Sequence, residues 1–281
     1  MIRIITDSAA DFEPAELAQK NILCIPLNVR FGEADYQENI NLSKPQFYEL
    51  LAATGEMPKT SQPSPQLLLE LFQDAKNAGD EAIYITISSA ISGTYQSALM
   101  TCELAEYDGA HVLDSRNATG GQRMLVEYAV KLRNQGASAA EILEKVGALR
   151  DRIVLYACID TLEYLYKGGR ISHTTYTLGS LAQIKPIIRV AEDGSIAVPS
   201  KAMGMRKGMD LLCKRLSAQV PSPEFPLYVM YTSNRSVAET LAEKFRKLGH
   251  QIPDDHIIGV GAAIGAHVGP DACGMIYVEQ E

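Results

Sequence analysis

The sequence predicts an α/β protein of two domains, with a parallel-sheet α/β/α domain at the N-terminus and a mixed-sheet, two-layer α/β domain at the C-terminus. Short apolar segments alternate with helix-like segments through the first half of the chain, which is typical of βα units. In the second half, an Asp-Gly turn between two strand-like segments indicates antiparallel pairing. The 281 residues suit two domains of about 150 residues each, and we place these at 1–160 and 161–281.

Nearly continuous apolar runs predict the strands of the first domain, because a strand of a parallel sheet is covered on both faces. Sequences typical of capping boxes at Ser43 and Ser138, and Ser64 before a proline, indicate where three helices begin. Parallel strands place binding loops at their carboxyl ends. The predicted strands are residues 2–6, 22–29, 81–87, 110–113 and 153–159.

The second domain is expected to begin with a hairpin. Segments 185–190 and 195–202 flank the dipeptide Asp193-Gly194, which favours a tight turn. Later segments have the patterns of both helices and strands, and together with the hairpin they predict a mixed sheet. The predicted helices are 203–219 and 236–248, and the predicted strands are 227–231 and 274–278.

Composition and charge exclude several classes of protein. Hydrophobic residues make up 46% of the chain and charged residues 21%, which excludes disorder, collagen and coiled coil. No segment approaches the roughly 18 uninterrupted apolar residues of a membrane helix. Asp7 interrupts the apolar start before a signal-peptide core could form, so a cytoplasmic protein is expected. Residues 1–160 carry a net charge of −9, which argues against a nucleic-acid partner.

The sequence contains no motif for a bound metal or nucleotide. The five cysteines are scattered singly, without the spacing of a zinc site or a disulfide framework, so reduced thiols are expected. No Gly-x₄-Gly-Lys-Ser/Thr sequence occurs, so the chain has no phosphate-binding loop of that type. We therefore expect no cofactor and no metal.

Two loops of the first half are rich in small hydroxyl residues. Segment 88–94 leaves a predicted strand and enters a helix near Gly93, so its amides and the Ser92 hydroxyl are placed to bind an anion at a helix N-terminus. Neighbouring prolines hold Thr60 and Ser61, whose hydroxyls would therefore recognise oxygen at low entropic cost. Each loop also has a structural explanation, with Ser92 as a helix cap and Thr60 and Ser61 as part of a turn.

A third candidate is His267, which lies among four glycines in the segment 259–270. Glycine permits close approach of the backbone to a ligand. Imidazole titrates near pH 6.5 when unperturbed, so it can donate to a bound acid or exchange a proton with it. A histidine with a structural role is the alternative. The glycine spacing is not that of a dinucleotide-binding fingerprint.

Residues 167–215 form a basic stretch with a net charge of +6. Arg170 follows two glycines where the domains would meet, and it could bond carbonyl groups between the domains or reach an anionic ligand or partner. Lys201, Arg206 and Lys207 follow in the same stretch. A solvated surface and a docking patch both remain open for these residues.

Carboxylates near the end of the first strand allow two interpretations. Asp7 and Asp11 could bind a metal, whereas Asp11 before Phe12-Glu13-Pro14 also fits the entry to a helix. A serine hydrolase is the alternative function, with Ser92 as nucleophile, His267 as base and Asp7 as the acid. The sequence Ala90-Ile91-Ser92-Gly93 lacks the glycine two residues before the serine that a nucleophile elbow requires.

Taken together, these segments resemble the DegV family, whose members include the fatty-acid-binding subunits of the bacterial fatty acid kinase. The resemblance covers nearly the whole chain, and its specificity comes from the combination of motifs. The matching segments are Thr6-Asp7-Ser8, Lys59-Thr60-Ser61-Gln62-Pro63-Ser64, Ser92-Gly93-Thr94-Tyr95-Gln96-Ser97-Ala98, Asp114-Ser115, Lys167-Gly168-Gly169-Arg170-Ile171-Ser172, Lys185-Pro186 and Gly265-Ala266-His267-Val268-Gly269-Pro270.

The resemblance implies a DegV-like fold that buries one long-chain fatty acid, with its tail in an apolar tunnel of the second domain. It also implies that the hydroxyls of Thr60, Ser61 and Ser92, the Gly93 amide and the His267 imidazole surround the carboxylate. A separate kinase subunit would bind ATP and convert the carboxylate to an acyl phosphate for phospholipid synthesis. Arg170, Lys201, Arg206 and Lys207 would then form an interdomain or docking face for that subunit.

One residue departs from the family pattern. Gly269-Pro270 is followed by Asp271, where the family usually has glycine. This carboxylate would either raise the pKa of the bound acid or point away from it.

Overall fold

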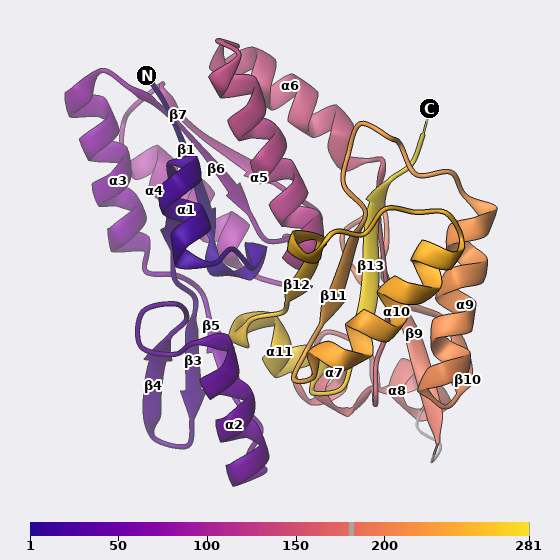
Figure 1. Ribbon diagram of the computed structural model, residues 1–281. Coiled ribbons are helices and arrows are strands. Elements are labelled where there is room, and N and C mark those ends of the chain that lie inside the picture. Colours follow the sequence, from indigo (N-terminus) through magenta and orange to yellow (C-terminus); the bar gives the residue numbers. More distant parts are fainter. Residues whose placement is uncertain (180–182, 281) are drawn as a thin grey trace.

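The computed structural model describes residues 1–179 and 183–280, which form three β-sheets with their helices (Figure 1). The first sheet has four parallel strands in the order β2-β1-β6-β7. Helices α3 and α4 cover one face of it, and α5 and α6 cover the other. The bounds are β1 Ile2–Asp7, η1 Ser8–Ala10, α1 Pro14–Lys20, β2 Ile22–Ile25, α3 Pro65–Ala78, β6 Glu81–Thr86, α4 Thr94–Leu104, β7 Ala110–Asp114, α5 Thr119–Asn134 and α6 Ala139–Arg150.

Local sequence signals set the starts of three helices as predicted. Ser43 and Ser138 form complete capping boxes, and Ser64 caps α3 with a proline in the first turn. Asp11 does not cap α1, the helix that follows it, because it comes after η1 with a left-handed backbone (φ 60°) and Glu13 is the cap of α1. The prediction that Asp11 fits a helix entry is therefore wrong.

The second sheet is mixed, with the strand order β10-β9-β8-β13-β11-β12. Only β11 and β12 are parallel neighbours, and the predicted hairpin is formed by β9 and β10. A parallel sheet and a mixed sheet together confirm the predicted fold class. The bounds are β8 Ile153–Cys158, α7 Glu163–Lys167, α8 His173–Gly179, β9 Ile184–Val190, β10 Ile196–Met203, α9 Met205–Ala218, β11 Tyr228–Tyr231, α10 Arg235–Lys247, η2 Asp254–His256, β12 Ile257–Gly259, α11 Ala262–Val268 and β13 Cys273–Val278.

The strand predicted at 153–159 belongs to the second sheet, and its assignment to the parallel sheet is wrong. β8 pairs antiparallel with both β13 and β9 in the middle of the mixed sheet. A central strand is covered on both faces in either kind of sheet, so its apolar run does not report its direction. The division of the chain into domains at residue 160 stays a prediction.

A small third sheet, with the order β4-β3-β5, is absent from the sequence-based description. The segment predicted as one strand at 22–29 divides into β2 and β3, which belong to different sheets. Thr60 and Ser61 lie in β5, a short strand rather than a turn. The bounds are β3 Asn28–Phe31, β4 Ala34–Gln37, α2 Lys44–Thr54 and β5 Lys59–Ser61.

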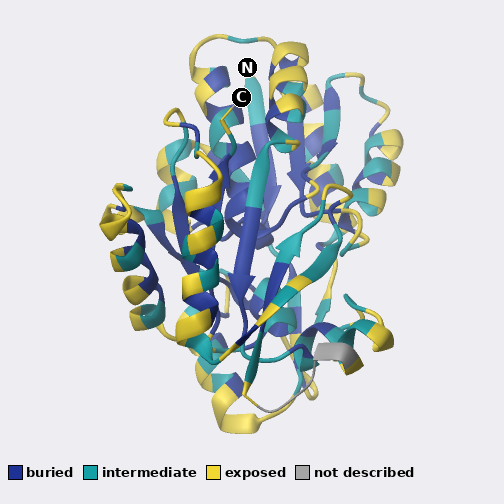
Figure 2. Cartoon of the chain, turned by 90° about the vertical axis from the view of Figure 1, so that its right-hand side faces the viewer, coloured by how far each residue is buried: buried dark blue, intermediate teal, exposed yellow. Residues whose placement is uncertain are grey.

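The two large sheets share one apolar core. Helices α9 and α10 cover the outer face of the second sheet, and its inner face turns toward the first sheet and α5. Ile4 and Ile83 of the first sheet belong to the same buried cluster as Leu155 and Ile276 of the second. Figure 2 shows the central strands mostly buried, other strands partly exposed, and the helices exposed mainly on one side.

Within the described residues, no helix combines the length and the apolar character needed to cross a membrane.

Candidate functional site

A cavity lies between the inner face of the second sheet, the loops that follow β6 and β7, and α11. Its empty volume is about 840 Å³ with the open mouth included. Most of its lining is apolar. The apolar lining residues that belong to strands of the second sheet are Leu155, Ala157, Ile188, Val190, Ile196, Met230, Cys273 and Gly274.

Small residues form the floor of this cavity. The strand register places Met230, Gly274, Ala157 and Ile188 side by side on four neighbouring strands. Gly274 and Ala157, the two in the middle, are the smallest, and the end of the Met230 side chain lies over Gly274. Together they form an apolar trough along β13 and β8. A larger side chain, Leu155, stands two residues before Ala157 on the same face of β8.

Polar groups gather where α11 meets β5. Thr60 Oγ1 lies 2.8 Å from His267 Nε2, and both residues line the cavity. The two residues are 207 positions apart in sequence, and they meet because α11 packs on the small sheet and on α2. Two of the sequence candidates are therefore direct partners.

His267 is a neutral imidazole at pH 7. Burial is the main cause, and the positive charge of Arg170 adds to it, so that the pKa of His267 falls from 6.5 to about 4. Nδ1 has no hydrogen-bond partner among the described residues. The ring lies against Gly168, where a Cβ atom would clash with Nδ1. A glycine is therefore required at this position for the ring to fit.

Arg170 brings a positive charge to the same end of the cavity. Its Nε donates to Ile91 O at 2.9 Å, and its Nη1 donates to Gly168 O. These carbonyl contacts match the bridging role that the sequence left open, yet Arg170 also lines the cavity. No acidic side chain in the ranges 1–179 and 183–280 forms an ion pair with it. An anion in the cavity would supply the missing counter-charge.

Ser92 lines the cavity and also supports the helix that follows it. Its Oγ shares a hydrogen bond of 2.8 Å with Thr94 Oγ1 and accepts from Thr94 N at 3.3 Å. Gly93 occupies the N-cap position of α4 and is exposed. The Ser92 side chain therefore both supports the start of α4 and lines the cavity.

Two candidates lie outside the cavity lining. Ser61 is exposed, because neighbouring residues of β5 point to opposite faces and Thr60 takes the inner one. Gly93 is also outside the lining. The structure thus brings together Thr60, Ser92 and His267 and does not add Ser61 or Gly93 to them.

The basic candidates divide into two locations. Arg170 lies inside, whereas Lys201, Arg206 and Lys207 are exposed on β10 and on the first turn of α9. Asp271, the departure from the family pattern, has a left-handed backbone (φ 57°) and accepts a hydrogen bond from Ser233. It therefore points away from the cavity.

The geometry does not assemble a serine hydrolase. His267 bonds Thr60, and the Asp7 carboxylate is fully buried, where it accepts from the amides of Ala9 and Ile87 and from Gln122. Ser92 has Thr94 as its partner. Across residues 1–179 and 183–280, no group of three or more His, Cys, Asp or Glu side chains is arranged to hold a metal ion.

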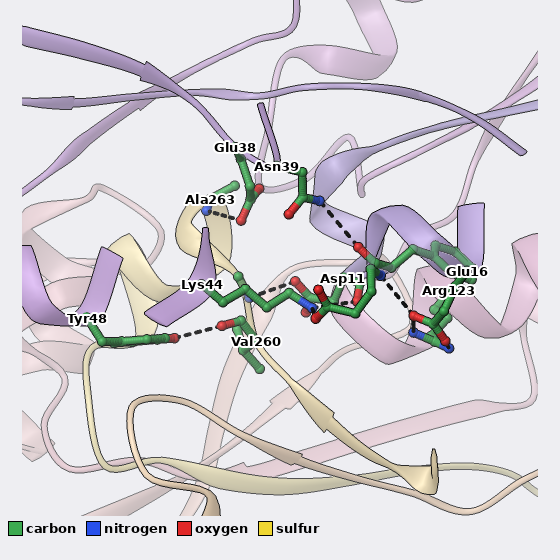
Figure 3. Close-up of polar contacts among 12 residues, drawn as sticks. Asp11, Glu16, Glu38, Asn39, Lys44, Tyr48, Arg123, Val260 and Ala263 are labelled. Atoms are coloured by element: carbon green, nitrogen blue, oxygen red, sulfur yellow. Dashed lines mark hydrogen bonds and ion pairs between the residues drawn. The ribbon is translucent and has the colours of Figure 1, made fainter. Parts of the chain in front are cut away.

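Sequence reasoning missed Glu38, which lies just beyond β4. Its carboxylate and that of Asp11 are buried beside the N-terminus of α11, the helix that carries His267 (Figure 3). Glu38 stands in the polar run Asp35-Tyr36-Gln37-Glu38-Asn39, which has the pattern of a solvated turn. Only the glycines around residue 261 hint at a close approach there.

The arrangement suits one amphipathic anion. An apolar trough would hold a hydrocarbon, and one end of it offers a hydroxyl pair, a neutral imidazole and an arginine without a carboxylate partner. A carboxylate that leaves water needs several donors to offset its desolvation, and this end supplies them.

Comparison with known proteins points to one family. The profile of the DegV family, described as uncharacterised proteins, matches residues 1–280. A DegV domain-containing protein of Caldanaerobacter subterraneus is 33% identical, with 99% of each chain covered.

Solved structures agree with this match. A fatty-acid-binding DegV family protein from Thermus thermophilus has a TM-score of 0.88 at 26% identity, with 99% of each chain covered. The fatty-acid-binding protein DegV of Bacillus subtilis has a TM-score of 0.83 at 28% identity, again with 99% of each chain covered.

We predict that the His267 imidazole of the ligand-free protein titrates near pH 4. Because the pKa of the ring is lower in the folded protein than in the unfolded chain, protonation favours unfolding. The free energy of unfolding should therefore fall as the pH falls from 6.5 toward about 4. NMR titration of the ring nitrogens measures this. In Arg170→Gln the pKa should rise only part of the way, since burial remains the larger cause. A wild-type titration near 6.5 would contradict the prediction.

Proposed function

The chain belongs to the DegV family, and from this premise we propose that it binds one long-chain fatty acid in the cavity between its two large sheets. DegV family proteins of known structure bind fatty acids. The observation that carries the proposal here is the pairing of an apolar trough with an arginine and a neutral histidine at one end. Few ligands other than a fatty acid match both halves of that description.

The acyl tail would supply most of the affinity. Each buried CH₂ group contributes about 0.8 kcal/mol, and the trough over Gly274 and Ala157 is lined by apolar side chains along its length. The tail would therefore lie on the sheet of the second half, as the resemblance implies.

The carboxylate would be bound by Thr60, Ser92 and His267, with Arg170 as its counter-charge. All four line the cavity. Thr60 and neutral His267 already share a hydrogen bond. A bound carboxylate would therefore accept hydrogen bonds from uncharged groups, the hydroxyls and the imidazole, while Arg170 would supply the positive charge. Ser61 and the Gly93 amide remain further proposed contacts, although their groups lie outside the present lining.

We further propose that the protein presents this carboxylate to a separate ATP-dependent kinase subunit, which would form an acyl phosphate for phospholipid synthesis in the cytoplasm. The sequence has no phosphate-binding loop of the common type, which supports a carrier role over an enzymatic one. The exposed side chains of Lys201, Arg206 and Lys207 lie together on β10 and α9 and are the proposed docking face.

We predict that the purified protein carries a fatty acid of about 14 to 18 carbons, because burial of that many CH₂ groups binds tightly. Mass spectrometry of an organic extract tests this. Thr60→Val, Ser92→Ala and His267→Ala should each weaken binding about tenfold or more, since each removes one hydrogen bond to a charged group. Thr240→Val, at an exposed hydroxyl of α10 outside the cavity, is the matched control and should bind normally. No acid in the extract, and no exchange with added acid, would contradict the proposal.

A second prediction concerns the trough. Ala157→Leu should exclude the longest acids while shorter ones still bind, because the added side chain fills the floor beneath the tail. Binding titrations with a series of saturated acids measure the limit. Ala242→Leu, in α10 on the outer face of the sheet, overpacks the core elsewhere and is the control. If Ala157→Leu bound the same range of acid chain lengths as the wild type, the tail would have to lie elsewhere in the protein.

A third prediction separates docking from binding. Charge reversal at Lys201, Arg206 and Lys207 should abolish acyl phosphate formation with a fatty acid kinase subunit and leave fatty-acid affinity unchanged, because these exposed side chains lie outside the cavity. An ADP-release assay with the loaded protein, ATP and the kinase subunit tests this, because transfer of the γ-phosphoryl group to the carboxylate leaves ADP. Normal phosphorylation of the reversed variant would exclude this face as the docking site.

A further inference from the structure

Two carboxylates hold the N-terminus of α11. Gly261 N donates to Asp11 Oδ1 at 2.8 Å, and Ala263 N donates to Glu38 Oε1 at 3.2 Å (Figure 3). The first amides of a helix have no partner within the helix, so these acceptors complete its start. They come from distant parts of the chain, after β1 and after β4, and meet only at this helix.

The two carboxylates crowd the same point. A Cβ atom on Gly261 would overlap Glu38 Oε1 and lie 3.0 Å from Asp11 Oδ1, so only glycine fits between them. Both side chains are 1% exposed. The second oxygen of each, Asp11 Oδ2 and Glu38 Oε2, is buried without a hydrogen-bond partner among the described residues. A proton on Glu38 would remove one of the two negative charges that adjoin here.

The electrostatics favour a proton on Glu38. Burial raises the pKa of Asp11 and of Glu38, and the negative charge of Asp11 raises that of Glu38 further, to about 7. Lys44 opposes both shifts, and its Nζ donates to Asp11 O at 2.8 Å. Arg123 of α5 lowers the pKa of Asp11, and burial and the charge of the pair raise the pKa of Tyr48 of α2. Burial raises the pKa of Cys24 of β2, and Asp7 of β1 and Glu38 raise it further. Tyr231 of β11 acts on Tyr48.

We propose that Asp11 and Glu38 are positioning residues for His267: together they clamp the start of the helix whose last turn carries the imidazole. α11 has only seven residues, so its two ends lie about 10 Å apart and move as one body. Tyr48 OH donates to Val260 O at 3.0 Å just before the helix, and Thr60 holds His267 at its other end. A shift at Gly261 therefore displaces the ring from Thr60.

This inference rests on the proposed function only for its effect on the ligand. As the pH rises through about 7, Glu38 loses its proton and two negative charges adjoin at Gly261. Because the pKa of Glu38 is raised, its contribution to stability is complete below 4.5 and is lost as the pH rises through about 7. Affinity for a fatty acid should fall over the same range.

Glu38→Gln and Glu38→Ala test the proposal together. The glutamine amide can accept from Ala263 N and is uncharged, as protonated Glu38 is, so His267 ring-nitrogen NMR shifts and affinity near pH 6.5 should match the wild type. Affinity of this variant should also stay level to about pH 8.5. In Glu38→Ala the ring shifts should move, and a fluorescent fatty acid should bind about tenfold more weakly.

Ile142→Ala is the control, because it opens the core beside α6 without touching α11. It should keep the ring shifts and the affinity of the wild type. Unchanged His267 shifts in Glu38→Ala, or a wild-type pH slope in Glu38→Gln, would overturn the proposal. The ring shifts are measured without ligand, so they decide it even if no fatty acid binds, a result that would instead refute the proposed function.

Discussion

The hydrogen bond between Thr60 and His267 joins the small sheet to the end of α11, and the rest of the site is arranged around it. Thr60 is brought there by β5, which pairs with β3, and α11 packs on the same small sheet and on α2. The imidazole then fits against Gly168, whose segment also carries Arg170. Three separate stretches of chain thus converge on one ring.

Charge at the site is balanced so that a bound acid completes it. Arg170 donates to two carbonyl oxygens and has no carboxylate partner among the described residues. The same charge, added to burial, keeps His267 neutral. The buried acids Asp11 and Glu38 lie at the far end of α11, where they bond amides and do not neutralise the arginine. The positive charge of Arg170 is therefore available to pair with the carboxylate of a ligand.

Local signals predicted much of the fold, and long-range pairing explains what they missed. Ser43, Ser64 and Ser138 cap helices because capping depends on a few adjacent residues. The direction of β8 depends on β13, more than a hundred residues later, so its own sequence could not show it. Thr60, Ser92, Arg170 and His267 were identified by residue type and resemblance. Glu38 was not identified, because it is buried against Gly261, and nothing in the sequence around Glu38 indicates that contact.

Gly274 and Ala157 bring the backbone of β13 and β8 close to the centre of the trough, and the end of the Met230 side chain lies over Gly274. Met230 can change rotamer to accommodate a guest, but the hydrogen-bonded strands in the middle of the sheet cannot move. Most of the adjustment must therefore come from the guest. Curvature of the hydrocarbon, such as a bend at a double bond, becomes a property that this surface can discriminate independently of carbon number.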